Sequence, residues 1–251
     1  MSEAIGPYAM KMKNDTAKAR SKPKIIGSQI ARMRGWLSMT PPTFQEEVLK
    51  RCRSLTFQSG ETLYHLGEEH GGIYGLIEGG VAISAAPTDR GPYLVHFGRP
   101  GFWVGAAPLF MSRRLVSVTA TRPSVCLHLP QNEIQAMVSG IPSAWRLFGM
   151  LAMFNCDLTM SALDDLMIRD PVKRCAAVLL RLGDCRDPNL TEKGPIELDV
   201  RQEDIAMMAN LSRSATSNFL RSLEDRNVIS LEYRVITILD TEALRNEANT
   251  A

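Results

Sequence analysis

At 251 residues the chain is long enough for two ordinary domains, and its composition, 45% hydrophobic and 22% charged, is typical of a soluble globular protein. No apolar run reaches the roughly 18–20 uncharged residues of a membrane-spanning helix, and the lysine-bearing N-terminus lacks the apolar segment of a secretory leader. The five cysteines are odd in number and unclustered, so the sequence favours neither a disulfide framework nor a metal site and predicts a cytoplasmic protein.

The N-terminal segment is basic, although the net charge of the whole chain is only +2. Residues 1–35 carry eight Lys and Arg side chains against two acidic ones, among Ser, Pro and Gly and without an apolar period. We predict that residues 1–28 form a disordered extension. A basic arm that contacts phosphates is the alternative.

Residues 29–140 carry the signature of a small antiparallel β domain. Eleven of the 18 glycines lie between Gly60 and Gly105, where they separate short runs with β propensity. The predicted strands are Glu61–Leu66, Ile73–Ile77, Val81–Ala85, Tyr93–Gly98 and Phe102–Val104, followed by the alternating runs Val116–Ala120 and Val125–Leu129. Helices are expected on either side, at Phe44–Cys52 and around Ile134–Val138.

A long helix is predicted within residues 141–169, starting at Pro142 and running to about Ile168. Its apolar residues cover more than one face, so the helix should pack against its own domain and against the same helix of a second subunit. A simple core helix is the alternative. The residues predicted for the dimer interface are Phe148, Leu151, Ala152, Leu158, Ala162 and Leu166.

Residues 170–251 form a separate predicted domain. Asp170 is placed to cap a helix that starts at Pro171, and Arg169 with Asp170 is the expected hinge. The segment 201–226 then reads as two short helices with a break at Asn210-Leu211, where Asn tolerates a left-handed backbone. Ser212 caps the second helix, and two β runs around residues 232–234 predict a wing. This order is typical of a winged helix-turn-helix.

The second helix of a helix-turn-helix presents its first turns to the base edges of double-stranded DNA in the major groove. The residues predicted to contact DNA are Arg201, Gln202, Ser212, Arg213, Ser214, Ser217, Asn218 and Arg221. Residues 171–251 hold 11 Lys and Arg against 13 Asp and Glu, so the prediction depends on the motif and not on a basic field.

Over about residues 30–245 the chain resembles the Crp/Fnr superfamily of transcription regulators. The segments that carry the resemblance include GETLYHLGEE, IEGGVAIS, RDPVKRCAAVLLRL and LSRSATSNFLRSLEDRNVIS. It implies an α+β fold: a cyclic-nucleotide-binding-like antiparallel β-roll (a double-stranded jelly roll), a long dimerisation helix and a C-terminal winged helix-turn-helix. It also implies a homodimer on a palindromic operator, with RNA polymerase as a partner if the protein is an activator.

Within this resemblance Arg213 matches the guanine-reading arginine of the family. Ser214 stands where the family commonly has Glu, and Asn218 where many members have Arg. Because Asn pairs naturally with adenine, the preferred half-site should differ from the best-known one.

The resemblance also outlines an effector pocket, formed here by Gly105, Ala106, Ala107, Arg114, Leu115, Val116 and Thr159. Arg114 falls at the position that binds a cyclic phosphate, but Ala106 replaces the Glu that binds the ribose hydroxyl. Losing that charge-assisted hydrogen bond costs about 1.5–3 kcal/mol. The sequence therefore favours an unknown effector other than cyclic AMP, or none, and no cofactor is predicted.

Other chemistries find little support. An iron–sulfur site would need clustered cysteines, and the cysteines of this sequence are not clustered. A haem site would have to use His65, His70, His96 or His128, and the strand pattern around His128 is typical of a structural histidine. Cys185 lies in a polar loop and is the best redox candidate, whereas the other cysteines (Cys52, Cys126, Cys156 and Cys175) are expected in the core.

No nucleophile–base pair, phosphate-binding loop or metal spacing indicates an enzyme. The remaining alternative is a cyclic-nucleotide-like ligand-binding module that acts through protein partners. The predicted helix-turn-helix and wing argue against it.

Overall fold

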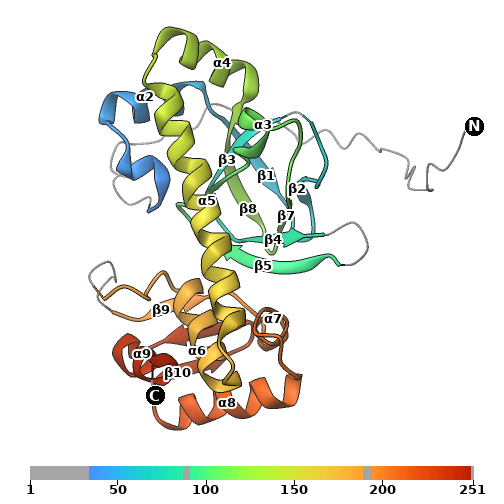
Figure 1. The fold of residues 1–251 in the computed structure, drawn as a ribbon, viewed down its shortest axis with the longest axis vertical. Coiled ribbons are helices and arrows are strands. Elements are labelled where there is room, and N and C mark those ends of the chain that lie inside the picture. The colour runs from blue at the N-terminus through green and yellow to red at the C-terminus, as the bar shows by residue number, and fades with distance from the viewer. Residues whose placement is uncertain (1–33, 70, 87–90, 189–193, 250–251) are drawn as a thin grey trace, which may run out of the picture.

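The computed structural model describes residues 34–69, 71–86, 91–188 and 194–249. In this part of the chain a β-roll and a smaller helix-rich domain are connected by one long helix (Figure 1). The predicted N-terminal extension, residues 1–28, lies outside the described residues, and so does His70.

The roll consists of two four-stranded antiparallel sheets, ordered β1-β8-β3-β6 and β2-β7-β4-β5. Their facing side chains enclose a core around Phe57, Val81 and Val118. All seven predicted strands are present, and β1 is an additional strand that the sequence analysis missed. The strands are β1 (Arg53–Phe57), β2 (Thr62–Tyr64), β3 (Gly72–Glu78), β4 (Val81–Ala85), β5 (Tyr93–Gly98), β6 (Trp103–Val104), β7 (Ser117–Ala120) and β8 (Ser124–Pro130).

Short helices cover the outer side of the first sheet. They are η1 (Trp36–Met39), α2 (Pro42–Arg51), α3 (Ala107–Phe110) and α4 (Gln131–Gly140). Beneath them Trp36, Phe44, Trp103 and Phe148 form an aromatic cluster with ring centroids 5.4–5.9 Å apart. Edge-on and tilted contacts of this kind add to the energy of simple burial, so this side of the roll is firmly packed.

The long helix α5 (Ala144–Met167) agrees with the predicted helix, but its two halves differ in burial. In the first half, Phe148 and Leu151 are buried in the apolar core that contains the aromatic cluster. Beyond Leu151, the only α5 residue that is buried is Asp165. The prediction that Phe148 and Leu151 face a second subunit is therefore wrong, because both side chains pack inside their own roll.

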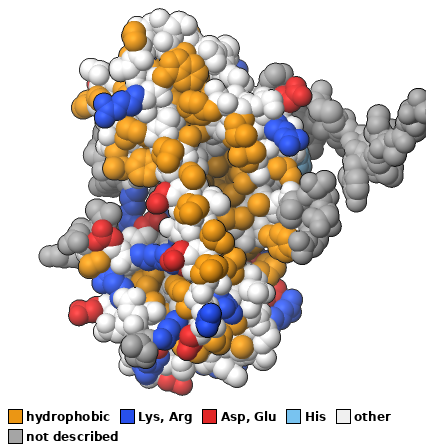
Figure 2. Space-filling view, viewed as in Figure 1, with side chains coloured by type: hydrophobic (Ala, Val, Ile, Leu, Met, Phe, Trp, Pro, Cys, Tyr) orange, Lys and Arg blue, Asp and Glu red, His pale blue; other side chains and the backbone are white. Residues whose placement is uncertain are grey.

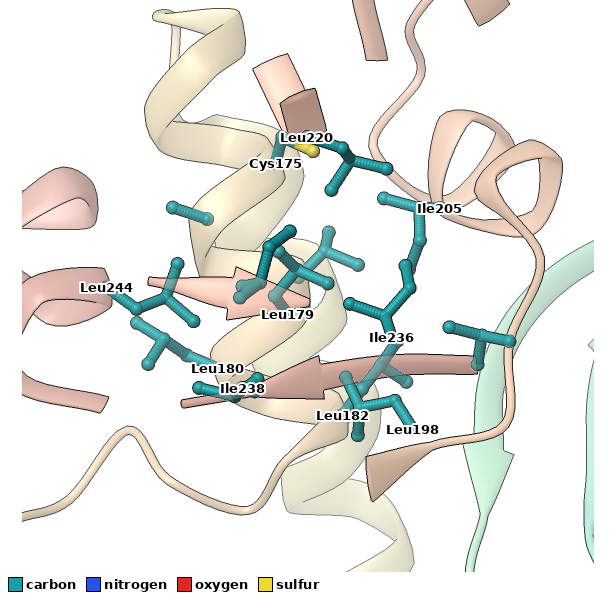
Figure 3. Close-up of a cluster of buried hydrophobic side chains, with 14 of the residues drawn as sticks. Cys175, Leu179, Leu180, Leu182, Leu198, Ile205, Leu220, Ile236, Ile238 and Leu244 are labelled. Atoms are coloured by element: carbon teal, nitrogen blue, oxygen red, sulfur yellow. The ribbon is translucent and has the colours of Figure 1, made fainter. Parts of the chain in front are cut away.

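The C-terminal domain begins where α5 ends. Asp170 accepts hydrogen bonds from the backbone amides of Val172 (2.8 Å) and Lys173 (3.2 Å), which confirms the predicted cap. A single apolar core unites its helices and sheet (Figure 3). The elements are α6 (Pro171–Leu182), β9 (Ile196–Leu198), α7 (Gln202–Met208), α8 (Arg213–Asp225), β10 (Ile229–Glu232), β11 (Val235–Ile238) and α9 (Thr241–Asn249). Neither β9 nor α9 was expected.

A set of buried polar side chains connects the roll, α5 and the C-terminal domain. The Nε of Arg181 on α6 donates to Oδ2 of Asp165 on α5 at 2.6 Å, and both side chains are almost fully buried. The same guanidinium donates from Nη1 to the carbonyl of Val95 at 3.0 Å and lies 3.3 Å from Nδ1 of His96, both on β5. We call Asp165, Arg181 and His96 the junction cluster. Phe97, also on β5, belongs to the core of the C-terminal domain, so the two domains share packing as well as polar contacts.

Candidate nucleic-acid interface

Helices α7 and α8 form the predicted helix-turn-helix. Asn210 adopts a left-handed backbone with φ of 51°, as the turn requires. The amide of Leu211 donates to the carbonyl of Ala206 at 2.9 Å and closes the turn. Ser212 then accepts from the amide of Ala215 at 3.2 Å, which confirms that it caps α8. The local geometry is therefore set by residues that the sequence analysis identified.

Helix α8 lies at the end of the molecule farthest from the roll (Figure 1). Phe219, Leu220 and Leu223 bury one face of it in the domain core. The opposite face carries the residues predicted to contact bases and phosphates. Arg213, Ser214, Asn218 and Arg221 are exposed there, and Ser217 is half-buried. The structure brings these five side chains together on one polar surface, which we call the recognition face.

Arg213 has an intramolecular partner at the start of this face. Its Nη1 lies 3.0 Å from a carboxylate oxygen of Glu203 on α7, with 78% of the arginine side chain and 45% of the glutamate side chain exposed. Such exposed ion pairs contribute between nothing and about 1 kcal/mol. The guanidinium is thus held near the N-terminus of α8 by a weak contact.

Arg201, which was also predicted to contact DNA, already has an acidic partner in the structure. Its guanidinium donates to both carboxylate oxygens of Asp204, at 3.0 and 2.8 Å, and this contact raises the pKa of the arginine. Arg201 also lines a cavity of about 400 Å³ between α7 and the roll. This bidentate contact at the beginning of α7 commits Arg201 to the helix cap, while its neighbour Gln202 is exposed.

The wing is present as the hairpin β10–β11. Tyr233 at its tip is 91% exposed, and Arg234 completes the turn with φ of 63°. Arg234 also reaches the carbonyl of Thr121 in the roll at 3.4 Å. The wing therefore presents an aromatic side chain to solvent and contacts the roll.

In the roll, the residues of the predicted effector pocket do not form an open phosphate site. Arg114 is 1% exposed, and its guanidinium donates to the carbonyls of Gly105 (3.1 Å) and Gly72 (2.9 Å). The same group stacks on the Tyr64 ring with Cζ 3.8 Å from the centroid. A side chain at Gly105 would collide with it, so the glycine makes room for the arginine. Arg114 serves here as a buried structural residue.

The other residues predicted for the effector pocket differ in their exposure to solvent. Ala106 is buried, Ala107 and Val116 are half-buried, and Leu115 is exposed. Thr159 on α5 is exposed and donates to the carbonyl of Asn155 at 3.0 Å. Neither Arg114 nor Thr159 lines the cavity of about 400 Å³ beside α7 or a second cavity of about 790 Å³ between the two domains.

Two of the described histidines, His96 and His128, have structural environments. His65 is exposed. His128 stacks on Tyr74 with centroids 4.5 Å apart, and its Nε2 lies 2.8 Å from the carbonyl of Gly71. Burial beside Arg181 lowers the pKa of His96 to about 3, so its ring is neutral. Among the described residues no group of His, Cys, Asp and Glu is placed to hold a metal ion.

Two cysteine predictions are wrong, and they are wrong in opposite directions. Cys185, predicted as the best redox candidate because it lies in a polar loop, is fully buried, and burial raises the pKa of its thiol to about 11. Its sulfur points to the carbonyl of Leu180 because the loop folds back on α6. Cys156, expected in the core, is exposed on α5. Cys52, Cys126 and Cys175 are buried as predicted.

The exposed side of α5 carries an apolar stripe that the sequence analysis did not separate from the buried face. Figure 2 shows apolar side chains along this helix. Exposed residues follow one another at intervals of three and four, which is the spacing of a two-stranded coiled coil. They are Met153, Cys156, Met160, Leu163 and Met167, and we call them the exposed stripe. The predicted interface residue Leu166 is also exposed, whereas Ala152, Leu158 and Ala162 are half-buried. Counting from Gly149 in steps of four and three would have found the stripe.

Comparison with known proteins adds independent support for both domains. Two family models match the chain: the cyclic nucleotide-binding domain over residues 54–140 and the Crp-like helix-turn-helix domain over residues 173–247. The chain is 24% identical to the cAMP-activated global transcriptional regulator CRP of Pasteurella multocida over 198 residues, which are 78% of this chain and 94% of that protein.

Solved structures show the same fold. FixK2 from Bradyrhizobium japonicum superposes with a TM-score of 0.67 at 16% identity, covering 80% of this chain and 98% of that one. A transcriptional regulator of the CRP family from Thermus thermophilus gives a TM-score of 0.59 at 25% identity, covering 78% and 97%.

A roll of the cyclic-nucleotide-binding type, joined by a long helix to a winged helix-turn-helix with an exposed polar face, defines a DNA-binding transcription regulator. The chain belongs to the Crp/Fnr family of these regulators. Among the described residues no helix is long and apolar enough to cross a membrane.

Proposed function

We propose that the protein is a homodimer that reads a palindromic operator in the cytoplasm, with one recognition face in each major groove. The observation that carries this proposal is the polar surface of α8, which is exposed at the far end of the molecule and begins with Arg213. An arginine at this position suits the O6 and N7 acceptors of guanine, and Asn218 suits adenine. Two such helices in a dimer would address half-sites about 34 Å apart.

The exposed stripe supports the dimer. Five apolar side chains on the free face of one helix are costly in water, and a second copy of α5 would bury them at coiled-coil spacing. We therefore place the dimer contact on the stripe and on Leu166, with Ala162 and Leu158 at its edge. Three of the five residues are methionines, whose flexible side chains adapt to a partner surface.

The effector is proposed to be a small molecule other than cyclic AMP. Arg114 already donates to two backbone carbonyls, and Ala106 offers no acceptor for a ribose hydroxyl. The hinge at Arg169 and Asp170 would pass the effector's influence from the roll to α8. If the protein is an activator, RNA polymerase is the further partner.

The test of DNA recognition begins with selection of an operator from random duplexes. Fluorescence anisotropy then measures its affinity at several salt concentrations. We expect Arg213→Ala to weaken the selected site by about 1–3 kcal/mol and to relax the preference at one base pair. The control is Arg146→Ala, which removes an exposed arginine at the opposite end of the molecule. Equal affinity of wild type and Arg213→Ala would remove Arg213 from base recognition, and failure to enrich any sequence would contradict the proposal.

The test of the dimer is Met160→Lys, measured by analytical ultracentrifugation. A charge at the centre of the exposed stripe would be buried on association, so we expect the dimer dissociation constant to rise by about a hundredfold or more. Ser143→Lys adds the same charge just before α5 begins and serves as the control. A Met160→Lys protein that still dimerises with wild-type affinity would place the interface elsewhere.

A further inference from the structure

A cavity lies between the two domains and outside the predicted effector pocket. Its volume is about 790 Å³, within the range of sites that enclose small organic molecules. The roll contributes residues 96–103, α5 contributes Phe154, Leu158 and Ser161, and the C-terminal domain contributes residues 180–182 and 197–200. All three parts of the molecule thus form its wall.

Two buried donors on this wall have no acceptor. Trp103 is 2% exposed, and its indole Nε1 makes no hydrogen bond. Arg99 uses Nη2 to donate to Gly183 and Asp184, at 2.9 and 2.7 Å, but its Nε is buried without a partner. Leaving a buried donor unsatisfied is costly, and native proteins rarely do so without a bound molecule or a functional reason. Arg99 begins a tight turn in which the amide of Phe102 donates to the carbonyl of Arg99 at 2.9 Å, and Trp103 follows this turn as the first residue of β6.

The rest of the wall explains which molecule would fit. Besides Trp103, the aromatic residues Trp36, Phe97, Phe102 and Phe154 line the cavity, and its wall also carries five arginines and five acidic residues. Rings of this kind favour a flat, apolar body. Two N–H donors, one of them on a guanidinium, favour an anionic acceptor over a neutral one. A carboxylate attached to an aromatic ring satisfies both requirements.

We propose that this interdomain cavity binds a small aromatic carboxylate, with the carboxylate accepting hydrogen bonds from Trp103 Nε1 and Arg99 Nε. The ligand would touch the roll, α5 and the C-terminal domain together, so its affinity depends on how the two domains are docked. DNA affinity would change by the same factor by which DNA changes ligand affinity. That regulatory effect rests on the proposed function, whereas binding itself does not.

The experiment is isothermal titration calorimetry of the full chain, without DNA, against benzoate, phenylacetate and indole-3-acetate. Benzamide, the neutral analogue of benzoate, tests the need for the negative charge. We expect at least one carboxylate to bind with one site per chain, and the amide to bind at least about tenfold more weakly. If none of the three carboxylates binds wild type, the proposed site is wrong.

Variants then locate the site. Trp103→Phe keeps an aromatic ring but removes the unpaired donor, and we expect it to weaken binding by about tenfold or more. The matched control is Trp145→Phe, the same substitution at an exposed tryptophan on α5 that does not line the cavity. Equal weakening in both variants would overturn the proposal.

Two further variants protect the test from misfolding. Arg99→Lys keeps a cation beside Asp184 but lacks the Nε donor, and Ser161→Phe fills part of the cavity from α5. Circular dichroism identifies which variants are folded, and every folded variant of the two should bind the carboxylate at least about tenfold more weakly than wild type. Titration of wild type with operator DNA separates the two proposals: a wild-type protein that binds operator but none of the carboxylates contradicts the cavity proposal alone, and one that binds a carboxylate but no operator contradicts the DNA-binding proposal alone.

Discussion

The recognition face and the predicted effector pocket of the roll each contain an arginine that matches a functional arginine of the family. The two arginines differ in burial and in their partners. Arg213 is exposed and held by one weak ion pair with Glu203. Arg114 is buried, donates to two carbonyls and stacks on Tyr64. A matching residue type therefore supports a binding role only where the side chain is free to leave its protein partners. By this criterion α8 is ready for a ligand, and the pocket around Arg114 is not.

The largest expected effect concerns the junction cluster, which couples these two regions. Asp165→Ala leaves the buried Arg181 without its carboxylate and also removes an ion pair with the partly exposed Arg186, and we expect it to lower the free energy of unfolding by about 3–5 kcal/mol in urea denaturation. The double variant Asp165→Leu/Arg181→Met removes both charges and should recover most of the loss. A single variant that costs under about 1 kcal/mol would show that water reaches the pair and that the domains are loosely joined.

Arg114→Met tests whether the roll arginine is structural. Loss of two charge-assisted hydrogen bonds should lower the free energy of unfolding by about 2–3 kcal/mol, while calorimetry with cyclic AMP should show no binding in wild type or variant. Arg113→Met, at the exposed neighbouring position, is the control. The contrast between the two arginines collapses if Arg114→Met unfolds like wild type and abolishes a measurable cyclic AMP affinity.

His96 should make the domain junction sensitive to acid. The unfolded chain takes up a proton near pH 6.5, but the folded ring resists until about pH 3, so stability is complete above pH 6.5 and falls as the pH drops toward 3. At pH 5 the expected loss is about 2 kcal/mol. His96→Leu should flatten this part of the pH–stability curve measured by thermal unfolding, and His65→Leu, at an exposed position, should not. An unchanged slope in His96→Leu would show that the ring protonates freely in the folded protein.

The smallest effect sharpens the description of the recognition face. Glu203→Gln removes the ion pair that holds Arg213, and we expect less than about 0.5 kcal/mol of change in the free energy of unfolding. Operator affinity at low salt should rise a few-fold, because a competing carboxylate is gone and the interface loses one negative charge. A fall in affinity would mean that Glu203 orients Arg213 for its base.

Much of this architecture was predictable because local sequence signals coincide with the tertiary contacts. Asn210 and Ser212 specify the turn and cap of the helix-turn-helix by their own backbone and side-chain chemistry, and glycine-bounded alternation marks seven strands of the roll. The strands β1 and β9 were missed since they are short and gain their stability from pairing with distant segments.

The burial of particular side chains was less predictable. The periodicity of α5 shows two apolar faces but not which of them packs against the roll. Phe148 was therefore predicted at the dimer interface although it is buried, and Met160 was not predicted there although it is exposed. Cys185 is buried because a polar loop returns to α6, a contact between segments that no local pattern records. The interdomain cavity depends on how three parts of the chain dock, which lies beyond any single segment.

The junction cluster also determines how this protein could be recombined with its relatives. A chimaera cut at Arg169-Asp170 would keep Asp165 on one side and lose Arg181 on the other, leaving a buried carboxylate beside a foreign helix. Phe97 would likewise face an unmatched core. Exchangeable DNA-binding modules of this chain should therefore include the last turns of α5 and bring a matching β5, so the unit of exchange is larger than the domain that the helix break delimits.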